Sequence, residues 1–407
     1  MIRFIFLATL FSTLNIVHAQ GTATSAINSD KRDSSHFAKE RELIPGETMG
    51  QKIESLLFWS VAEKKKRFPH MHQIFPSVEV QAGDKTSTLL LASTIQDEIG
   101  EEQYVDSYMK KNNIAGLMVL KGNEIRLEKY ADDVERNTVW TSFSVGKSVT
   151  SMLLGVALKE GDVESLDDPL SKYISELDGT DYGEVSVRQL LTMTSGIEWN
   201  EDYADHESDV AQMYLQPCKA EEPHILTYMK PLKSIHEAGK KFNYSTGETD
   251  LLGILIQEAT GKSLAEYLSE KIWKPYGMEH NAFWLADECS MMNLGGSGLS
   301  ATLRDYSRLG KLMLDQEKHA FFADEWRENA TSLLLPVSED GGGYGYLWWR
   351  FPNGSYAAVG IFGQMIYINP ETDVVIAQFA AWPKAGSAEL SAERAGFIKA
   401  VEKALQE

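Results

Sequence analysis

The chain has 407 residues, 43% of them hydrophobic, and a formal net charge of −20. A chain of this length and apolar content can bury a large core, in one large domain or two interlocked ones. The acidic charge argues against nucleic acids and anionic lipid surfaces as partners, because both are bound through basic patches.

Residues 1–19 have the pattern of a secretory signal peptide. Arg3 precedes an apolar core from Phe4 to Val17, and Val17-His18-Ala19 fits a cleavage site before Gln20. The apolar core is shorter than the roughly 20 residues that span a bilayer. The residue directly after the predicted cleavage site is Gln20, not a cysteine that could carry a lipid anchor. We therefore expect an exported protein, periplasmic or secreted, without a stable membrane anchor.

The next two segments lack periodic apolar patterns. Residues 20–43 are rich in Ser, Thr, Ala and charge, which is typical of a disordered linker. Residues 44–102 carry apolar anchors without a clear period and predict an irregular, packed N-terminal extension. His70 and His72 form the only close histidine pair, and with no third ligand nearby we interpret them as surface residues rather than a metal site.

The main domain is expected to span residues 103–407, and it opens with a β-hairpin. Ile114–Leu120 and Glu124–Tyr130 have strand character and are joined by Lys121-Gly122-Asn123.

Ser144 and Lys147 follow this hairpin at a predicted strand–helix junction. An extended run ends at Phe143, and an apolar run of helix length begins at Val149. Ser144 and Lys147, one turn apart, lie on the same helix face. Burial removes solvation from the ammonium, so its pKa falls and it can share protons with the serine, whose amide is also an oxyanion donor. Taken alone, a capping serine with a snorkelling lysine fits the pattern equally well.

The same Ser-x-x-Lys spacing occurs at Ser107 and Lys110. These residues lie in a predicted amphipathic helix, residues 101–111, whose charges spread over a solvated face. An isolated motif match without a buried setting predicts no chemistry.

The middle of the chain, from Lys159 to about Lys318, is predicted to be a mainly helical subdomain. Helices are expected at residues 188–194, 250–260, 264–273 and 302–314, strands at 344–350, 355–368 and 373–379, and a terminal helix at 389–405. Strands on both sides of a helical middle predict an α+β fold: an antiparallel sheet from distant segments, flanked by helices, with an inserted helical domain. Cys218 and Cys289 are the only cysteines, and the sequence leaves open whether they pair.

Tyr244 lies in a loop before the helix expected at residues 250–260. Near an ammonium, a phenolate is stabilised, so the pKa of Tyr244 is expected to fall and the residue to act as a general base. Considered alone, Tyr244 is better interpreted as a core tyrosine with one hydrogen bond.

Several motifs follow one another in a characteristic order. After Ser-x-x-Lys come Leu-Leu-Thr-Met-Thr-Ser-Gly-Ile197, Phe-Asn-Tyr244-Ser-Thr-Gly, and Gly295-Gly-Ser-Gly-Leu-Ser-Ala-Thr-Leu-Arg-Asp305. From about Gln103 to the C-terminus the chain resembles the serine β-lactamase-related superfamily. The nearest likeness is to its class C branch, with DD-peptidases, family VIII-type esterases and 6-aminohexanoate-dimer hydrolases. The resemblance implies a β-lactamase/transpeptidase-like fold, with Ser144 as nucleophile, Lys147 as its partner and Tyr244 as base.

Two motifs depart from the β-lactamase pattern. The second motif ends in Thr246, where β-lactamases usually have Asn. The third, normally Lys-Thr-Gly, corresponds to Ala357-Ala-Val-Gly360-Ile361-Phe-Gly-Gln364 and has no Lys. That Lys binds the substrate carboxylate in penicillin-type sites, so its absence argues against β-lactam and D-Ala-D-Ala cleavage. The stretch at Gly360 looks more like the 6-aminohexanoate-dimer hydrolases, in which the N–H at the Ile361 position completes the oxyanion hole.

Two further positions are candidate substrate contacts. Tyr203 follows the Thr-Ser-Gly turn, where related enzymes place a substrate-facing loop. Trp348, on the strand expected before Gly360, is a candidate wall of the site, with core packing as an equal alternative.

We therefore expect an exported serine hydrolase that cleaves ester or linear amide bonds of a small molecule through an acyl-enzyme and needs no metal or other cofactor. One alternative is a β-lactamase or D-Ala-D-Ala carboxypeptidase. The other is a non-catalytic binding or sensor module on a hydrolase scaffold. The sequence leaves the natural substrate and the oligomeric state open.

Overall fold

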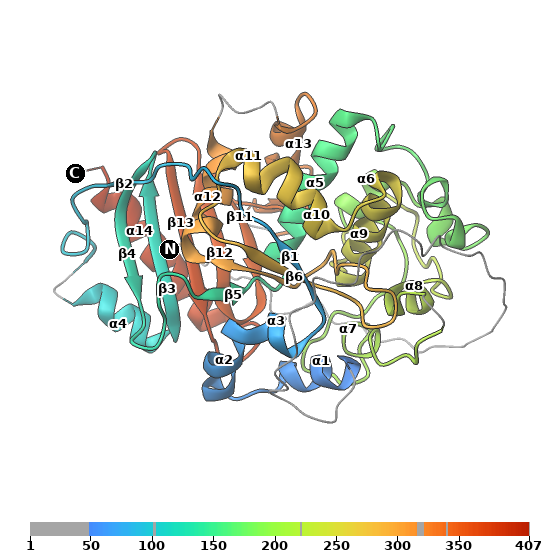
Figure 1. The fold of residues 1–407 in the computed structure, drawn as a ribbon, viewed down its shortest axis with the longest axis horizontal. Coiled ribbons are helices and arrows are strands. Elements are labelled where there is room, and N and C mark those ends of the chain that lie inside the picture. Colours follow the sequence, from blue (N-terminus) through green and yellow to red (C-terminus); the bar gives the residue numbers. More distant parts are fainter. Residues whose placement is uncertain (1–48, 101–102, 220–221, 316–320, 339–340, 407) are drawn as a thin grey trace.

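The computed structural model describes residues 49–100, 103–219, 222–315, 321–338 and 341–406 (Figure 1). The predicted signal peptide, residues 1–19, and the predicted linker, residues 20–43, lie outside this part of the chain. Within the described residues, no helix combines the length and the apolar character needed to cross a bilayer.

The strands form two sheets. The larger sheet has the order β2-β4-β3-β13-β12-β11-β10-β9-β8, and its pairs are antiparallel except β2 with β4. Its strands are β2 (Leu90–Leu91), β3 (Ile114–Lys121), β4 (Glu124–Tyr130), β8 (Leu335–Pro336), β9 (Gly343–Tyr344), β10 (Trp349–Arg350), β11 (Tyr356–Gly360), β12 (Gln364–Asn369) and β13 (Val374–Ala380). The smaller sheet has the order β1-β6-β7-β5. Its strands are β1 (Ser77–Val80), β5 (Val139–Thr141), β6 (Ala282–Leu285) and β7 (Leu299–Thr302).

The described helices surround and separate these sheets. The α-helices are α1 (Met49–Leu57), α2 (Val61–Arg67), α3 (Met71–Ile74), α4 (Tyr104–Lys111), α5 (Val145–Glu160), α6 (Val187–Leu191), α7 (Asp209–Gln212), α8 (His224–Met229), α9 (Thr246–Thr260), α10 (Leu264–Leu268), α11 (Lys274–Tyr276), α12 (Leu303–Leu314), α13 (Trp326–Thr331) and α14 (Ala388–Ala404). The short 3₁₀ segments are η3 (Phe68–His70), η4 (Leu170–Lys172), η5 (Ser175–Leu177), η6 (Tyr182–Glu184) and η9 (Ile361–Gly363), and η7 (Ser269–Trp273) is π-helical.

The pairing of β3 with β13 joins segments from opposite ends of the main domain. Together with the helices around the sheet, this confirms the expected α+β architecture, and the hairpin predicted at residues 114–130 is confirmed as β3 and β4.

Local signals explain where the helices near the site begin and end. The Ser245 side chain accepts a hydrogen bond from the Glu248 N–H at 3.1 Å and starts α9, and Gly261, at φ 65°, ends it. Thr302 starts α12 in the same way, because it accepts from the Asp305 N–H at 3.2 Å. Such caps satisfy amides that have no partner inside the helix.

Helices cover both faces of the large sheet. Helix α12 packs on β3, β12 and β13. It approaches closely at Gly310, where an added Cβ would lie 2.6 Å from the Val375 side chain. On the other face, Tyr108 of α4 stacks on Phe397 of α14 with ring centroids 4.2 Å apart and donates to Gln378 Oε1 at 2.6 Å.

Helix α5 carries the predicted nucleophile and is almost wholly buried. It packs between strand β11 of the large sheet and helix α9. In Figure 1, α6, α8 and α9 group at the right, and the large sheet lies at the left. The N-terminus of α5 therefore lies between the sheet and the helical region.

The N-terminal extension is packed as expected, and the prediction of an irregular segment holds for most of residues 81–100 but is wrong for residues 49–80. The described part forms α1, α2 and α3, and β1 then joins the small sheet, with Ser77 paired to Leu285 of β6. His72 is buried and stacks on Phe283 at 4.1 Å, so its interpretation as a surface residue is wrong. Its contacts come from β6, about 200 residues later, and no local pattern shows them.

Three other secondary-structure predictions need correction. Strands β6 and β7 interrupt the region predicted to be mainly helical. The strand expected at residues 344–350 is two short strands around a turn in which Leu347 has φ 63°. The strand expected at 355–368 is broken by Ile361–Gly363, where Phe362 has φ 59°. Non-glycine residues rarely adopt this left-handed backbone, so an apolar run gives no sign of the turn.

Candidate active site

The structure brings Ser144 and Lys147 together at the start of α5. Both side chains are buried, with Lys147 only 1% exposed. Lys147 Nζ donates to Ser144 Oγ at 3.1 Å, to Thr246 Oγ1 at 2.8 Å and to the Gly296 carbonyl at 2.8 Å. These three bonds use all the donors of an ammonium and hold Nζ beside the serine hydroxyl.

Burial lowers the pKa of Lys147 to about 8, although the nearby charges of Glu201 and Asp250 oppose the shift. The pKa fall expected for this lysine is therefore confirmed. An amine with this pKa can accept or give a proton near neutral pH.

Tyr244 lies on the loop before α9, within reach of the same group. Lys147 Nζ lies 5.1 Å from its ring centroid, and the Ser144 hydroxyl acts to lower the pKa of the phenol. Burial, and next the charge of Glu201, raise the pKa of Tyr244 well above its ordinary value. The predicted fall of this pKa is therefore wrong, because burial and the charge of Glu201 both raise it. Tyr244 is a neutral phenol at neutral pH.

Glu201 is part of the site and was missed by sequence reasoning. Its carboxylate accepts hydrogen bonds from the Thr246 N–H at 2.9 Å, from the Tyr203 hydroxyl at 2.6 Å, and from the Thr246 hydroxyl and the Trp199 indole N–H. It therefore fixes Thr246, which in turn accepts from Lys147. The available signal was an acidic residue soon after the Thr-Ser-Gly turn. The hydroxyl of Tyr203, predicted to contact substrate, is bonded to this carboxylate.

Asp250 and the Gly295-Gly296 segment support Lys147 on the side where its Nζ donates to the Gly296 carbonyl. Asp250 Oδ1 accepts from the Gly296 N–H at 2.6 Å, and Oδ2 accepts from the Tyr214 hydroxyl at 2.5 Å. Burial raises the pKa of Asp250 to about 6. A Cβ on Gly296 would lie 2.8 Å from the Thr246 carbonyl oxygen. Glycine is therefore required where the Gly296 carbonyl meets the ammonium.

The two predicted oxyanion donors lie on neighbouring backbone segments. A Cβ on Gly360, the last residue of β11, would lie 2.6 Å from the Ser142 carbonyl oxygen and 3.2 Å from the Ser144 amide nitrogen. The end of β11 therefore runs beside the start of α5. Ser144 precedes the first turn of α5, and Ile361 is the first residue of η9. The first amides of a helix have no acceptor within it, so both N–H groups suit an incoming carbonyl oxygen.

Trp348 lies in the core rather than at the wall of the site. It is 1% exposed and packs edge-to-face on Tyr356, with centroids 5.6 Å apart. The next residue, Trp349, stacks with Tyr244 at 5.8 Å and also contacts Tyr344 at 4.8 Å. Trp348 lies between the left-handed turn at Leu347 and the first residue of β10, Trp349, so this turn decides which of the two tryptophans faces the site.

The third-motif strand offers no cation. Its residues Tyr356–Gly360 contain no lysine or arginine. Arg350, on the adjacent β10, donates to the carbonyls of Phe351 and Ser355 at 2.9 Å each. The guanidinium is thus bonded to its own hairpin.

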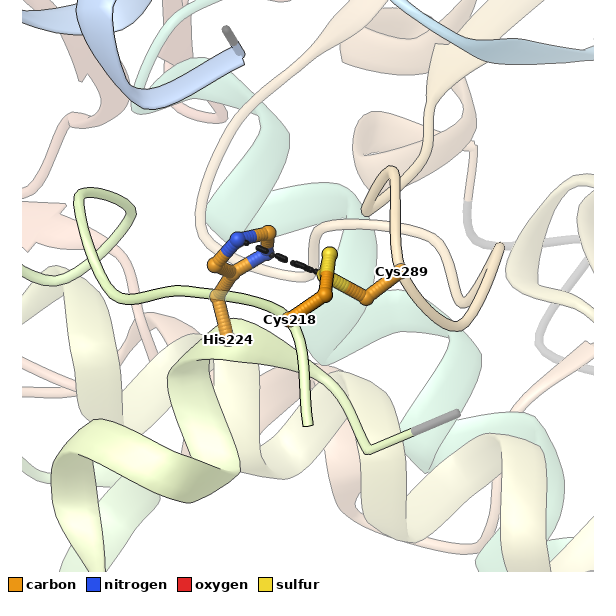
Figure 2. A group of neighbouring side chains, drawn as sticks. All are labelled: Cys218, His224 and Cys289. Carbon is orange, nitrogen blue, oxygen red and sulfur yellow. Dashed lines mark hydrogen bonds between the residues drawn. A yellow bond between two sulfur atoms is a disulfide. The ribbon is translucent and has the colours of Figure 1, made fainter. Parts of the chain in front are cut away.

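Cys218 and Cys289 form a disulfide, which answers the question that the sequence left open (Figure 2). With His224 they have ligand atoms within 4.8 Å of one another. Both sulfurs are bonded to each other, however, and His224 Nδ1 lies 2.7 Å from Asp287 Oδ2. Burial opposes protonation of this ring, but the hydrogen bond and charge of Asp287 outweigh it and raise the pKa of His224. The group is a disulfide beside a buried ion pair.

The chain is similar to known hydrolases over most of its length. The 6-aminohexanoate-dimer hydrolase of Paenarthrobacter ureafaciens is 24% identical over 388 residues, which cover 89% of this chain and 96% of that protein. A solved Bacillus anthracis structure, provisionally assigned to the same name, has a TM-score of 0.73 at 24% identity and covers 84% of this chain and 94% of its own. EstCE1, a hydrolase with promiscuous acyltransferase activity, has a TM-score of 0.61 at 15% identity, with 74% and 98% covered.

The structural likenesses show a common fold, and the family assignment comes from the sequence. Residues 102–398, which include Ser144, Lys147, Tyr244 and Ile361, match the family described as Beta-lactamase. The chain therefore belongs to the beta-lactamase family and is a serine hydrolase.

Proposed function

We propose that the protein hydrolyses ester or linear amide bonds of small molecules through an acyl-enzyme on Ser144. The contact of Lys147 Nζ with Ser144 Oγ at 3.1 Å carries this proposal, because a buried amine with a pKa of about 8 can take the serine proton at neutral pH. The hydrolase names of the relatives support it.

In the first step Ser144 Oγ bonds to the substrate carbonyl carbon and its proton passes to neutral Lys147. The carbonyl electron pair moves onto oxygen, and the resulting anion accepts hydrogen bonds from the amides of Ser144 and Ile361. Fixed donors at this position stabilise the charge that develops in the transition state.

In the second step the bond to the alcohol or amine breaks, and the leaving group takes a proton from the Tyr244 hydroxyl. The tyrosinate then takes the proton held by Lys147, whose Nζ lies 5.1 Å from the Tyr244 ring centroid. Water then attacks the acyl-enzyme by the same route and frees Ser144. The raised pKa of Tyr244 suits a proton donor. Lys147 therefore takes the role of general base that was predicted from the sequence for Tyr244.

The surroundings favour an uncharged acyl group. Trp349, Tyr344 and Phe242 form an aromatic cluster beside Tyr244, and β11 supplies no cation. A β-lactam carboxylate entering this site would lose its hydration without compensation, which costs about 3–5 kcal/mol for an unpaired buried charge. At about 1.36 kcal/mol per decade this corresponds to about two to four orders of magnitude in kcat/KM.

The test measures kcat/KM for p-nitrophenyl butyrate and for nitrocefin with the purified mature protein. The ester is expected to be the better substrate. A clear preference for nitrocefin would replace this proposal with a β-lactamase. Absence of turnover and of labelling by a fluorophosphonate would favour a binding module.

Matched serine variants test the nucleophile. Ser144→Ala is expected to lower kcat by several orders of magnitude, whereas Ser107→Ala, on the exposed face of α4, should keep wild-type activity. Equal losses in two folded variants would contradict the assignment of Ser144.

We further propose that the protein acts outside the cytoplasm. The pattern of residues 1–19 supports export, and the Cys218–Cys289 disulfide is typical of an oxidising compartment. N-terminal sequencing of the mature protein from cell fractions should begin at Gln20. A cytoplasmic protein that begins at Met1 would contradict export.

A further inference from the structure

The N-terminal extension reaches the backbone that carries the second oxyanion donor. Lys64 of α2 is fully buried, and its Nζ donates to the carbonyls of Trp382 at 3.2 Å and Pro383 at 2.7 Å. It also lies 4.0 Å from the centroid of the Phe362 ring. A lysine is rarely buried without a specific partner, and here the partners are two backbone carbonyls of one loop.

That loop holds the turn that begins at Ile361. The Trp382 N–H donates to the Phe362 carbonyl at 3.0 Å, and the Phe362 N–H donates to the Ala385 carbonyl at 3.0 Å. Phe362 has φ 59°, a conformation that is unfavourable for a non-glycine residue and persists only where its surroundings hold it. The orientation of the adjacent Ile361 N–H depends on this turn.

Phe68, which follows α2 directly, contacts both sides of the oxyanion site. Its ring centroid lies 5.0 Å from that of Phe143 and 5.7 Å from that of Phe362, and these two rings are 5.3 Å apart. Phe143 precedes Ser144 and, with φ 45°, is also left-handed. One fully buried ring therefore packs against the residue before Ser144 and the residue after Ile361.

We infer that Lys64 and Phe68 are positioning residues that set the relative placement of the Ser144 and Ile361 amides. Both lie outside the family-matched segment, residues 102–398, so this chain uses its N-terminal extension to complete its oxyanion hole. The inference rests on the proposed function, because the two amides serve as donors only in that reaction.

The test compares Lys64→Met with Lys66→Met. Both changes are on α2, and Lys66 is exposed. A fluorophosphonate first titrates reactive Ser144, so that kcat is expressed per competent site. Losing one oxyanion donor costs about 10²–10³ in kcat, and a displaced donor costs less. Lys64→Met is therefore expected to lower kcat for p-nitrophenyl butyrate by about tenfold to a hundredfold, with little change in KM, and Lys66→Met to change neither.

A second measurement separates positioning from folding. An alkylboronic acid forms a tetrahedral anionic adduct with the serine, and its affinity is expected to fall by the same factor as kcat in Lys64→Met. Phe68→Leu is expected to show the same fall in kcat and in boronate affinity. It provides the test if Lys64→Met does not fold.

A structural role alone would lower Tm and the titrated fraction but leave kcat per site and boronate affinity unchanged, and this result overturns the inference. An inactive wild type with unlabelled Ser144 would instead refute the proposed function, and this inference with it.

Discussion

Opposing electrostatic effects determine the pKa of Lys147. Burial lowers its pKa to about 8, and the charges of Glu201 and Asp250 act in the opposite direction. Full desolvation with no acidic neighbour would leave the amine unable to hold a proton, and full solvation would leave it unable to accept one. The site therefore has a lysine that can take part in both halves of the proposed reaction.

Lys147 and Tyr244 are expected to act as one unit in proton transfer. Lys147→Ala and Tyr244→Phe should each reduce the acylation rate by several orders of magnitude, and the double variant should be little slower than the worse single variant, because groups of one mechanism are strongly non-additive. Single-turnover measurements of acyl-enzyme formation check this. Multiplication of the two rate losses would show that the residues work independently.

The pH dependence of kcat/KM should follow Lys147. The ascending limb of the pH profile is expected to have its midpoint near pH 8, because kcat/KM should rise with pH as the ammonium loses its proton. Glu201→Gln removes a negative charge that raises this pKa, so the limb should move to lower pH.

Glu207→Gln, the same change at an exposed position of the same loop, should leave the limb in place. A limb that moves to higher pH in Glu201→Gln, or does not move, would contradict the electrostatic role of Glu201.

Close packing of a loop on helix α9 places the acceptors of Lys147. A Cβ on Gly253 of α9 would lie 2.8 Å from Gly295 Cα, and one on Gly295 would lie 2.3 Å from the Thr249 carbonyl oxygen. Backbone meets backbone here, so no side chain can rotate away to make room. Gly295 and Gly296 of the Gly295-Gly-Ser-Gly motif therefore serve the contact between the loop and the helix.

A matched pair of glycine substitutions tests this contact. Gly253→Ala should lower the free energy of unfolding by about 1–3 kcal/mol through overpacking, despite the better helix propensity of alanine. Gly396→Ala, in α14, meets nothing within 4 Å and should raise it by about 0.5–1 kcal/mol. Urea unfolding measures both. Stabilisation by both substitutions would mean that the loop can move away from α9 at no cost.

Contacts between distant segments hold the molecule together as one unit. The extension before residue 102 contributes β1 to the small sheet and Phe68 to the rings around the site. The Cys218–Cys289 disulfide joins the loop before α8 to the loop between β6 and β7. The latter loop also carries Gly296, an acceptor for Lys147.

The disulfide is expected to contribute to global stability. Cys218→Ser/Cys289→Ser should lose about 2–4 kcal/mol of unfolding free energy, because the cross-link restricts the unfolded chain. Dithiothreitol should bring the urea unfolding curve of the wild type to that of the variant and leave the variant unchanged. An unaltered wild-type curve after complete reduction would contradict this role.

Features that depend on neighbours along the chain were determined by the sequence alone. Ser144 and Lys147 are one helical turn apart, and the hairpin at residues 114–130 closes through a short turn. These interactions are local, so residue order is enough to predict them. The burial of Lys147 followed from the apolar helix around it.

Features that depend on contacts between distant segments were decided only by the tertiary structure. Glu201 reaches Thr246 across 45 residues, and Lys64 reaches Pro383 across 319. The upward shift of the Tyr244 pKa depended on burial of the phenol and on the Glu201 carboxylate, and no local pattern in the sequence predicts either. The choice of Trp349 over Trp348 depended on a left-handed turn at Leu347. Packing energies between remote segments select these arrangements, and such energies leave no period or spacing in the sequence.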